Sequence, residues 1–539
     1  IAPTAAAASP TSWVNYEETR KQPNPRPRRR IVCNEGRATF IENPFRGNVV
    51  DHLKSSRWSV DSNDAEQSTS SFRLSSVPDL AKSVQTKSMD SNIFSLGPVE
   101  MFRLWQVFLE RVNPMIKVIH VPSLEPLVFA AATGRLNTSA DFEALICSIN
   151  LVAILALSEF ETIQLLNVEK SHALRCSTLA LKTAMKKIDF LKKYSIGTIQ
   201  CLVLYLFSFQ GQVDRHVAWI WTGTLVRIAQ RMGLHRDGAR LGLSPFDTEI
   251  RRRIWWQIII LETKCAILAG FCDTLLPPNW DTKMPSNVND ADLLPGSLEP
   301  VKSREGATEM AFCLMLYESR LFFRNHLVPE FEAVIICEGN VGTENPKRFA
   351  RHSFDEYQQI VEKYEEALTT AERKYTNASA GGIHLMARKV RPLTTQRIRD
   401  MILHAQEPWD DKPDDQGNNG SFFRAWVIAF ESDVNWYDST DDKFVWYLKL
   451  HFRPDAFSAM IELLQWQPVG TLVDRAWKVI DQLYHYHPEM YDVRDQDNHH
   501  RAKNLLAGWS RRELAFRNLG IFCDTPLVVV KLRTFEVFE

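Results

Sequence analysis

From residue 99 onward, apolar and polar residues follow the spacing of amphipathic helices. Residues 101–112 carry one wide apolar face, formed by Leu104, Trp105, Phe108 and Val112 among others. Residues 142–158 and 199–209 are nearly apolar all round, which is typical of buried helices. Neither stretch has the ~18 uninterrupted apolar residues that a membrane span needs. The pattern therefore predicts buried helices and no membrane association.

Two helix boundaries can be located from the residues that flank them. Residues 217–232 keep the i, i+3, i+4, i+7 apolar spacing throughout, and Gly233 is the residue type that ends such a helix. Ser244 can cap the next helix, with Pro245 at its first position and Asp247 completing a near capping box. This helix is expected to continue to Gly270, and the prolines that follow predict an extended, irregular segment.

Beyond residue 300 the pattern stays helical. Further helices are expected at residues 308–324, 354–374, 394–405, 443–464 and 473–485. Residues 528–530, three consecutive valines, form the only β-like run, and no period of 20 to 50 residues repeats. The sequence therefore predicts an all-α fold, a large multi-helix domain preceded by a disordered linker.

Composition divides the chain into four parts. We expect a basic, Pro-rich linker at residues 1–37 and a short apolar island with a Ser-rich linker at 38–98. The helical domain then occupies 99–490, and a C-terminal tail occupies 491–539. Residues 55–95 contain 13 serines and few large apolar groups, too few to offset the entropy cost of ordering.

The first linker contains a basic run without acidic residues. Three prolines in it disfavour a helix. Two interpretations stay open: a nuclear-import signal or phosphate-contacting arm, and a solvated linker. The basic residues are Arg20, Lys21, Arg26, Arg28, Arg29 and Arg30.

Charge and cysteine content limit what the rest of the chain can bind. The 64 basic and 65 acidic residues give a net charge of -1, so no global field attracts nucleic acid. The nine cysteines are scattered, with no CxxC pair, so the usual zinc spacing is absent. We expect free thiols in a reducing compartment and no metal or cofactor in this chain.

The search for catalytic chemistry finds two weak candidates. Residues 410–415 have the letters of an aspartate-rich Mg²⁺ box, but Pro413 inside it predicts a turn. His485, His487, His499 and His500 lie near Asp495 and Asp497, and their spacing favours surface polar sequence over a metal site. No GxGxxG, GxxxxGK[ST], HExxH or GxSxG motif occurs, although distant residues could still assemble a catalytic site.

A run of three arginines, Arg251 to Arg253, precedes the pair Trp255-Trp256. Three consecutive helical residues fan through about 200°, and acidic residues are near, so we expect a solvated or salt-bridged helix face rather than a nucleic-acid patch. The two tryptophans are expected in the core or an interface.

This segment carries a resemblance. RMGLHRD at 231–237 followed by SPFDTEIRRRIWW at 244–256 is similar to the regulatory "middle homology" domain of fungal zinc-cluster transcription factors. Residues 104–123, 276–293 and 474–477 also resemble parts of that domain, and 40–45 resembles a segment that precedes it. Two features depart from the family: Glu262 stands where Asp is common, and the six-cysteine zinc cluster is absent.

The resemblance implies a nuclear regulator of RNA polymerase II transcription in a filamentous fungus, and not an enzyme. It implies DNA binding through a zinc cluster upstream of Ile1. The alternative is a family member without a zinc cluster, and the non-Met start favours the first of these two. Transcription machinery or co-regulators, a small-molecule effector and a second copy of the chain are the other partners that it implies.

The alternative is an enzyme or small-molecule-binding protein on the same helical scaffold that has lost the DNA-binding module. Six cysteines encoded upstream of Ile1 would favour the regulator. Loss of Mg²⁺-dependent stabilisation on replacing Asp410 and Asp411 by Ala would favour the enzyme.

Overall fold

The computed structural model describes residues 30–34, 37–41, 96–135, 139–209, 215–269, 274–326, 328, 353–406, 419–466, 468–520 and 522–535. The all-α prediction is confirmed for this part of the chain, with one small exception. A short antiparallel hairpin pairs β1 (Arg30–Asn34) with β2 (Arg37–Ile41), Arg30 opposite Ile41. The hydrophobic pattern of residues 30–41 did not predict this hairpin.

In the described residues from 96 to 292, the first half of the helical body contains eight α-helices with short helical turns between them. Their bounds are α2 (Pro98–Val107), η1 (Phe108–Val112), α3 (Val121–Ala132), α4 (Ala140–Ala156), α5 (Glu159–Leu166), α6 (Lys170–Ile188), α7 (Ile196–Ser208), α8 (Arg215–Arg231), η2 (Gly238–Leu241), α9 (Pro245–Ala269) and η3 (Asp290–Asp292). Helices α4 and α7 are the two expected to be buried, and each buries most of its residues. α4 packs against α6 and α7, and α8 packs against α9.

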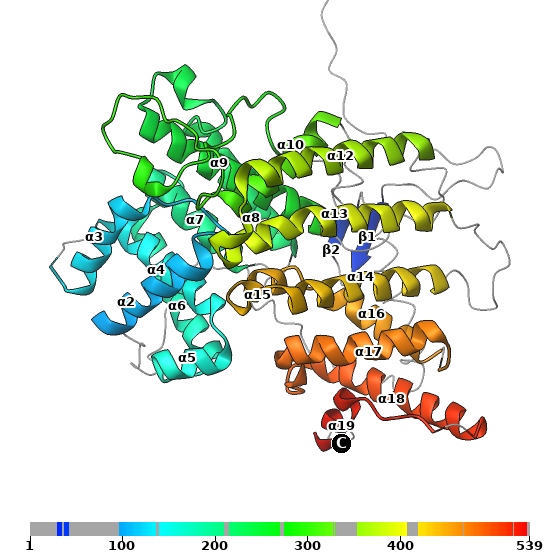
Figure 1. Ribbon diagram of the computed structural model, residues 1–539. Helices are drawn as coiled ribbons and strands as arrows, with labels where there is room; N and C mark the ends of the chain where they lie inside the picture. Colours follow the sequence, from blue (N-terminus) through cyan, green and yellow to red (C-terminus); the bar gives the residue numbers. More distant parts are fainter. Residues whose placement is uncertain are drawn as a thin grey trace, which may run out of the picture.

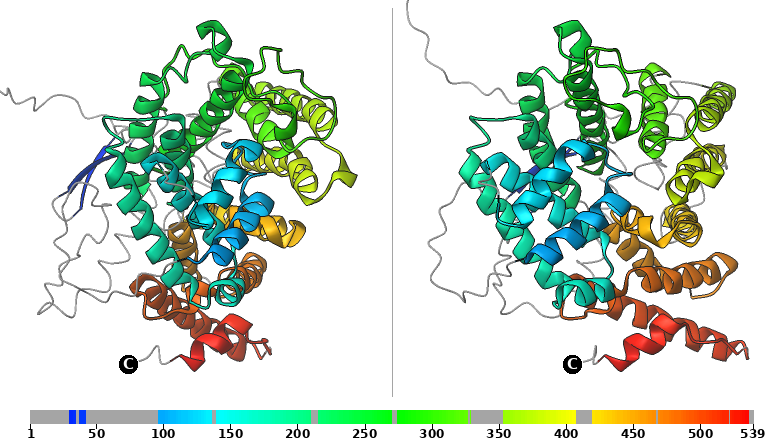
Figure 2. Two further views of the ribbon diagram at one scale, coloured as in Figure 1. Left: turned by 90° about the vertical axis from the view of Figure 1, so that its left-hand side faces the viewer. Right: turned by 60° about the vertical axis from the view of Figure 1, so that its left-hand side comes forward.

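The second half begins with α10 and then forms a stack. Its bounds are α10 (Ala311–His326), α12 (Phe354–Tyr375), η5 (Ala378–Ala380), α13 (Gly382–Gln406), α14 (Asn419–Ser439), α15 (Asp442–Lys449), α16 (Pro454–Leu464), α17 (Thr471–Tyr486), η6 (Pro488–Tyr491), α18 (Gln496–Asn518) and α19 (Leu527–Thr534). In Figure 1, α12, α13, α14, α17 and α18 lie one above another beside the first half. The side views show the α2–α9 bundle and this stack as two adjoining parts (Figure 2).

One hydrophobic core joins the two parts. A single cluster of buried apolar residues extends from Leu104 in α2 to Leu532 in α19. The aromatic pair Trp477 and Trp509, with ring centroids 5.2 Å apart, fixes α17 against α18. The residues expected as a C-terminal tail thus include two helices that pack on the body.

The flanking residues set helix ends as expected. Gly233 has φ +77°, and its N–H and that of Leu234 close the end of α8 on Gln230 and Ala229. The Ser244 hydroxyl oxygen accepts the Asp247 N–H at 3.0 Å, and its proton goes to the Asp247 carboxylate.

Two secondary-structure predictions are wrong, one for a helix and one for a β-like run. Residues 443–464 form two helices, because Pro454 starts α16 and its missing N–H cannot continue α15. The valine run at 528–530 is helical within α19, since Val528, Val529 and Leu532 together form a buried helix face. There the packing against α17 and α18 outweighs the β preference of valine.

A test of this packing is the contact between η2 and α9. A Cβ added to Gly238 would lie 2.9 Å from the Cα of Thr248 in α9, a backbone atom that cannot move aside alone. We expect Gly238→Ala to lower the free energy of unfolding by about 1–3 kcal/mol, as overpacking does. Urea denaturation followed by circular dichroism measures the change.

Gly197→Ala in α7 is the control, because its added Cβ would meet only the Ser195 hydroxyl oxygen at 3.6 Å. It should leave stability unchanged or raise it by about 0.4–1 kcal/mol. Equal losses in both variants would contradict the proposed close contact.

Candidate effector pocket and the buried charge cluster behind it

The three consecutive arginines of α9 have three different partners. Arg251 donates from Nη1 to the Met232 carbonyl at 2.8 Å, beyond the end of α8. Arg252 binds both carboxylate oxygens of Asp237, each at 2.8 Å. Arg253 is fully buried and reaches Asp290. Of the two expectations, a solvated or a salt-bridged helix face, salt bridges are confirmed for Arg252 and Arg253. Arg251 instead binds a backbone carbonyl, and the three side chains together connect α9 to other parts of the domain.

Trp255 and Trp256 lie in the core, as expected. Both rings meet Trp280 in edge-to-face contacts, with centroids 6.2 and 5.5 Å away. The indole N–H of Trp256 donates to the Lys283 carbonyl at 2.9 Å. The pair therefore fixes the irregular segment after α9 against the helix.

Asp290 is the centre of a buried charge cluster. Its Oδ1 accepts from Arg253 Nη1 at 2.5 Å, and its Oδ2 accepts from Lys117 Nζ at 2.9 Å. Lys117 also reaches Glu309 at 2.5 Å, and both cations have 0% exposed side chains. Lys117, Arg253 and Asp290 come from three segments far apart in the chain, so their pairing determines how these segments meet.

A second carboxylate, Glu249, extends the cluster along α9. Its Oε1 accepts the backbone N–H of Ser286 at 2.9 Å and lies 3.7 Å from Arg253 Nε. Burial raises the pKa of Glu249, and the charges of Arg253 and Arg252 act against that rise.

Burial alone would raise the pKa of Asp290 as well. The charges of Lys117 and Arg253 outweigh that effect, helped by hydrogen bonds from Arg253 and from the Val121 N–H, and lower the pKa to about 2. The carboxylate is therefore ionised at any physiological pH.

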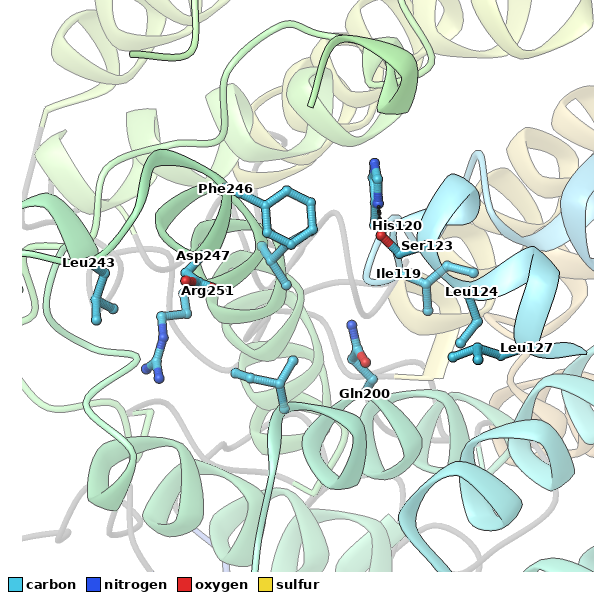
Figure 3. A pocket seen from close by; sticks show the side chains of 12 residues that line it. Ile119, His120, Ser123, Leu124, Leu127, Gln200, Leu243, Phe246, Asp247 and Arg251 are labelled. Carbon is cyan, nitrogen blue, oxygen red and sulfur yellow. Dashed lines mark hydrogen bonds between the residues drawn. The ribbon is translucent and has the colours of Figure 1, made fainter. Parts of the chain in front are cut away.

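Beside this cluster lies a pocket of about 470 Å³. One wall comes from α3 and the residues before it, the other from the start of α9, and the floor comes from α7 (Figure 3). Most of its lining is apolar. The lining residues are Ile119, His120, Ser123, Leu124, Leu127, Ile196, Gln200, Leu243, Phe246, Asp247, Ile250 and Arg251.

Hydrogen bonds join the pocket wall to the cluster. His120 Nε2 lies 2.9 Å from the Asp290 carbonyl oxygen, and the Val121 N–H donates to the Asp290 carboxylate at 3.0 Å. The His120 ring also meets Phe246 of the opposite wall edge-on, with centroids 5.0 Å apart. The position of the α3 wall therefore depends directly on Asp290.

The basic residues singled out in the sequence, Arg20, Lys21, Arg26, Arg28 and Arg29, lie outside the described residues. Arg30 is described only as the first residue of β1. The aspartate-rich segment 410–415 also lies outside the described part of the chain.

The histidine group is described, and one part of its interpretation is wrong. His487 is 2% exposed, stacks on Phe452 with centroids 4.1 Å apart, and contacts Glu489 through Nδ1 at 2.8 Å. It is a buried residue because it follows α17 directly and turns back into the core. Over the described ranges no three His, Cys, Asp or Glu side chains gather as metal ligands. No described helix is long and apolar enough to cross a membrane.

Sequence reasoning did not find the pocket or the cluster. Lys117, His120 and Asp290 lie in segments that the resemblance covers, but nothing in their spacing shows that they meet. Lys117 and Asp290 are 173 residues apart. The one available signal was Lys117 itself, a lysine inside the apolar run 115–119 with no acidic residue close in sequence, which indicates a buried cation paired with a distant carboxylate.

A test of the cluster is Asp290→Asn. The change leaves two buried cations without their shared carboxylate, so we expect the free energy of unfolding at neutral pH to fall by roughly 3–5 kcal/mol. The wild-type contribution is complete above the unfolded pKa of about 3.9 and is lost as pH falls through the folded value. The difference between wild type and variant should therefore shrink from pH 5 towards pH 2, measured by urea denaturation across that range.

Asp492→Asn is the matched control, since that carboxylate pairs with the exposed Arg494. It should change stability little at neutral pH. A small, pH-independent effect of Asp290→Asn would contradict the role given to the cluster.

Comparison with known proteins identifies a family for the chain. Residues 105–309 match the model of the fungal specific transcription factor domain. The chain is 35% identical over 513 residues to the pyriculol/pyriculariol biosynthesis cluster transcription factor 1 of Pyricularia oryzae, an alignment that covers 94% of this chain and 68% of that protein. No solved structure shows significant similarity to the chain.

Two further relatives are more distant. The aurofusarin cluster transcription factor aurR2 of Gibberella zeae is 27% identical, over 78% of this chain and 62% of its own length. The transcriptional regulator AacuB of Aspergillus aculeatus is 28% identical, over 77% of this chain and 55% of its own length. Several other relatives are named C6 finger domain transcription factors. The chain spans between about half and two thirds of these three proteins, and it belongs to the family of fungal transcription factors that contain the fungal-specific transcription factor domain.

Proposed function

We propose that this chain is the regulatory body of a fungal regulator of RNA polymerase II transcription. The observation that carries the proposal is the family membership: residues 105–309 match the domain model, and the alignment to the Pyricularia oryzae factor covers 94% of this chain. The relatives are named as transcription factors or regulators, and two of those names refer to biosynthesis or product clusters. Regulation of a set of biosynthetic genes is accordingly the role proposed for this chain.

DNA binding, in this proposal, belongs to a zinc cluster outside the 539 residues. The name C6 finger in several relatives supports such a module, and the nine cysteines here lack its spacing. Arg251, Arg252 and Arg253 are used inside the domain, so they are poor candidates for phosphate contacts.

Co-regulators, a second copy of the chain and a small-molecule effector are the proposed partners of the helical body. The enzyme alternative gains no support from the described residues, and the relatives are regulators by name.

The function can be tested by fusing the whole chain to a heterologous DNA-binding domain in a fungal host. We expect expression of a reporter gene with the matching DNA site to differ from that with the DNA-binding domain alone. The fusion with Asp290→Asn, whose cluster is disrupted, should lose the difference, and the fusion with Asp492→Asn should keep it. A reporter level equal to that of the DNA-binding domain alone, with the fusion protein present in the nucleus, would contradict a regulatory role.

The proposed nuclear location gives a second test. We expect replacement of Arg20, Lys21, Arg26, Arg28, Arg29 and Arg30 by Gln to abolish nuclear enrichment of a fluorescent fusion, because import signals depend on such basic clusters. The control replaces basic residues on or after α6: Arg175, Lys186, Lys187, Lys192 and Lys193. Unchanged enrichment in the first variant would overturn the import signal and leave a phosphate-contacting arm or a solvated linker.

A further inference from the structure

We propose that the pocket between α3 and α9 binds a neutral, largely apolar small molecule with a ring and at least one hydroxyl group that donates a hydrogen bond. This inference rests on the proposed function, because it assigns the effector site of the regulatory body. Volume, lining chemistry and the direction of the available hydrogen bonds support it.

The size and walls of the pocket suit a ring-bearing ligand. Its volume of about 470 Å³ lies within the range of about 300–1,000 Å³ usual for small-molecule sites. Leu124 and Leu127 face Phe246 across it (Figure 3), and His120 lies edge-on to Phe246. Ile250 adds further apolar lining. An aromatic or alicyclic body between these walls would bury apolar surface on both faces.

Gln200 supplies a directed polar group on the floor. Its side chain stands between the two walls and is only 8% exposed (Figure 3). Nε2 donates to the Val118 carbonyl at 2.7 Å, which fixes the amide orientation. Oε1 has no protein partner among the described residues, so the floor offers a hydrogen-bond acceptor.

Ser123 supplies a second acceptor. The Asp290 carbonyl can only accept, so His120 Nε2 carries the proton of that bond. In the neutral ring Nδ1 then accepts the Ser123 hydroxyl proton across 2.7 Å. The remaining lone pairs of Ser123 Oγ can only accept. Both of these groups therefore call for a donor on the ligand.

One acidic and one basic side chain of α9 line the pocket, so their charges balance. Asp247 and Arg251 lie one helical turn apart and both line the pocket, so one negative and one positive group face the same end. A charged ligand would gain attraction from one and repulsion from the other. A neutral hydroxylated molecule fits this lining better than an acid or an amine does.

A ligand bound in the pocket would affect the buried charge cluster through His120. His120 faces the pocket and donates to the backbone of Asp290, whose side chain holds Lys117 and Arg253. A ligand that fixes His120 and Phe246 would therefore stabilise the α3–α9 contact, and this gives the pocket a route to regulation.

The test compares two probes on the purified 539-residue chain: 2-naphthol, which has a hydroxyl donor, and 2-methoxynaphthalene, which has the same ring without one. We expect 2-naphthol to raise the melting temperature with concentration and to bind about fivefold more tightly, the value of one neutral hydrogen bond. Leu127→Trp should fill the pocket and abolish the shift. Leu385→Trp, at a similarly exposed leucine of α13, should not.

Ser123→Ala and Gln200→Met should each reduce the preference for 2-naphthol without abolishing binding of the ring. Equal affinity for the two probes would overturn the donor requirement. No binding, or binding that Leu127→Trp leaves unchanged, would overturn the site. Because these measurements need neither DNA nor transcription, they can fail while the reporter test succeeds, and the reverse.

Discussion

The structure depends on one interaction, the sharing of the Asp290 carboxylate by Lys117 and Arg253. Two cations with no solvent contact need carboxylates beside them, since each unpaired buried charge would cost several kcal/mol, and Asp290 is the carboxylate that both of them contact. This requirement holds the segment before α3, the α9 helix and the turn η3 together. The same kind of contact accounts for the Arg-Arg-Arg and Trp-Trp run of α9. Arg252 pairs with Asp237, Arg253 pairs with Asp290, and Trp256 donates a hydrogen bond to the Lys283 carbonyl. The motif is an internal framework.

The fold was largely predictable because helices reveal themselves locally. Gly233, Ser244 and Pro245 mark helix ends through backbone rules that hold within a few residues. Predictions failed where contacts with residues distant in sequence determine the structure. The valines of α19 are helical because α17 and α18 cover one face of that helix. His487 is buried because its ring stacks on Phe452. The pocket depends on side chains from α3, α7 and α9, and no sequence period connects Ser123, Gln200 and Phe246. The family resemblance supplied what periodicity could not, but only for the class of protein.

The pocket and the charge cluster are joined through Asp290, which is hydrogen-bonded to His120 and Val121 of the α3 wall. Asp290 contributes its side chain to the core ion pairs and its carbonyl to the pocket-side histidine. A small displacement of α3 would have to break either the His120 or the Val121 hydrogen bond to that one residue. Packed cores of this kind move between discrete arrangements rather than bending smoothly.

The stack of α12 to α19 has a different mechanical character. Its contacts run mainly between neighbouring layers: α12 with α13, α14 with α17 and α16, α16 with α18, and α19 with α17 and α18. In such an arrangement strain is passed on layer by layer and weakens at each step, as in repeat proteins. The outer helices can therefore vary or loosen while the α9 framework keeps its geometry. One chain thus combines a rigid α9 framework with a helical stack whose layers are joined mainly to their neighbours.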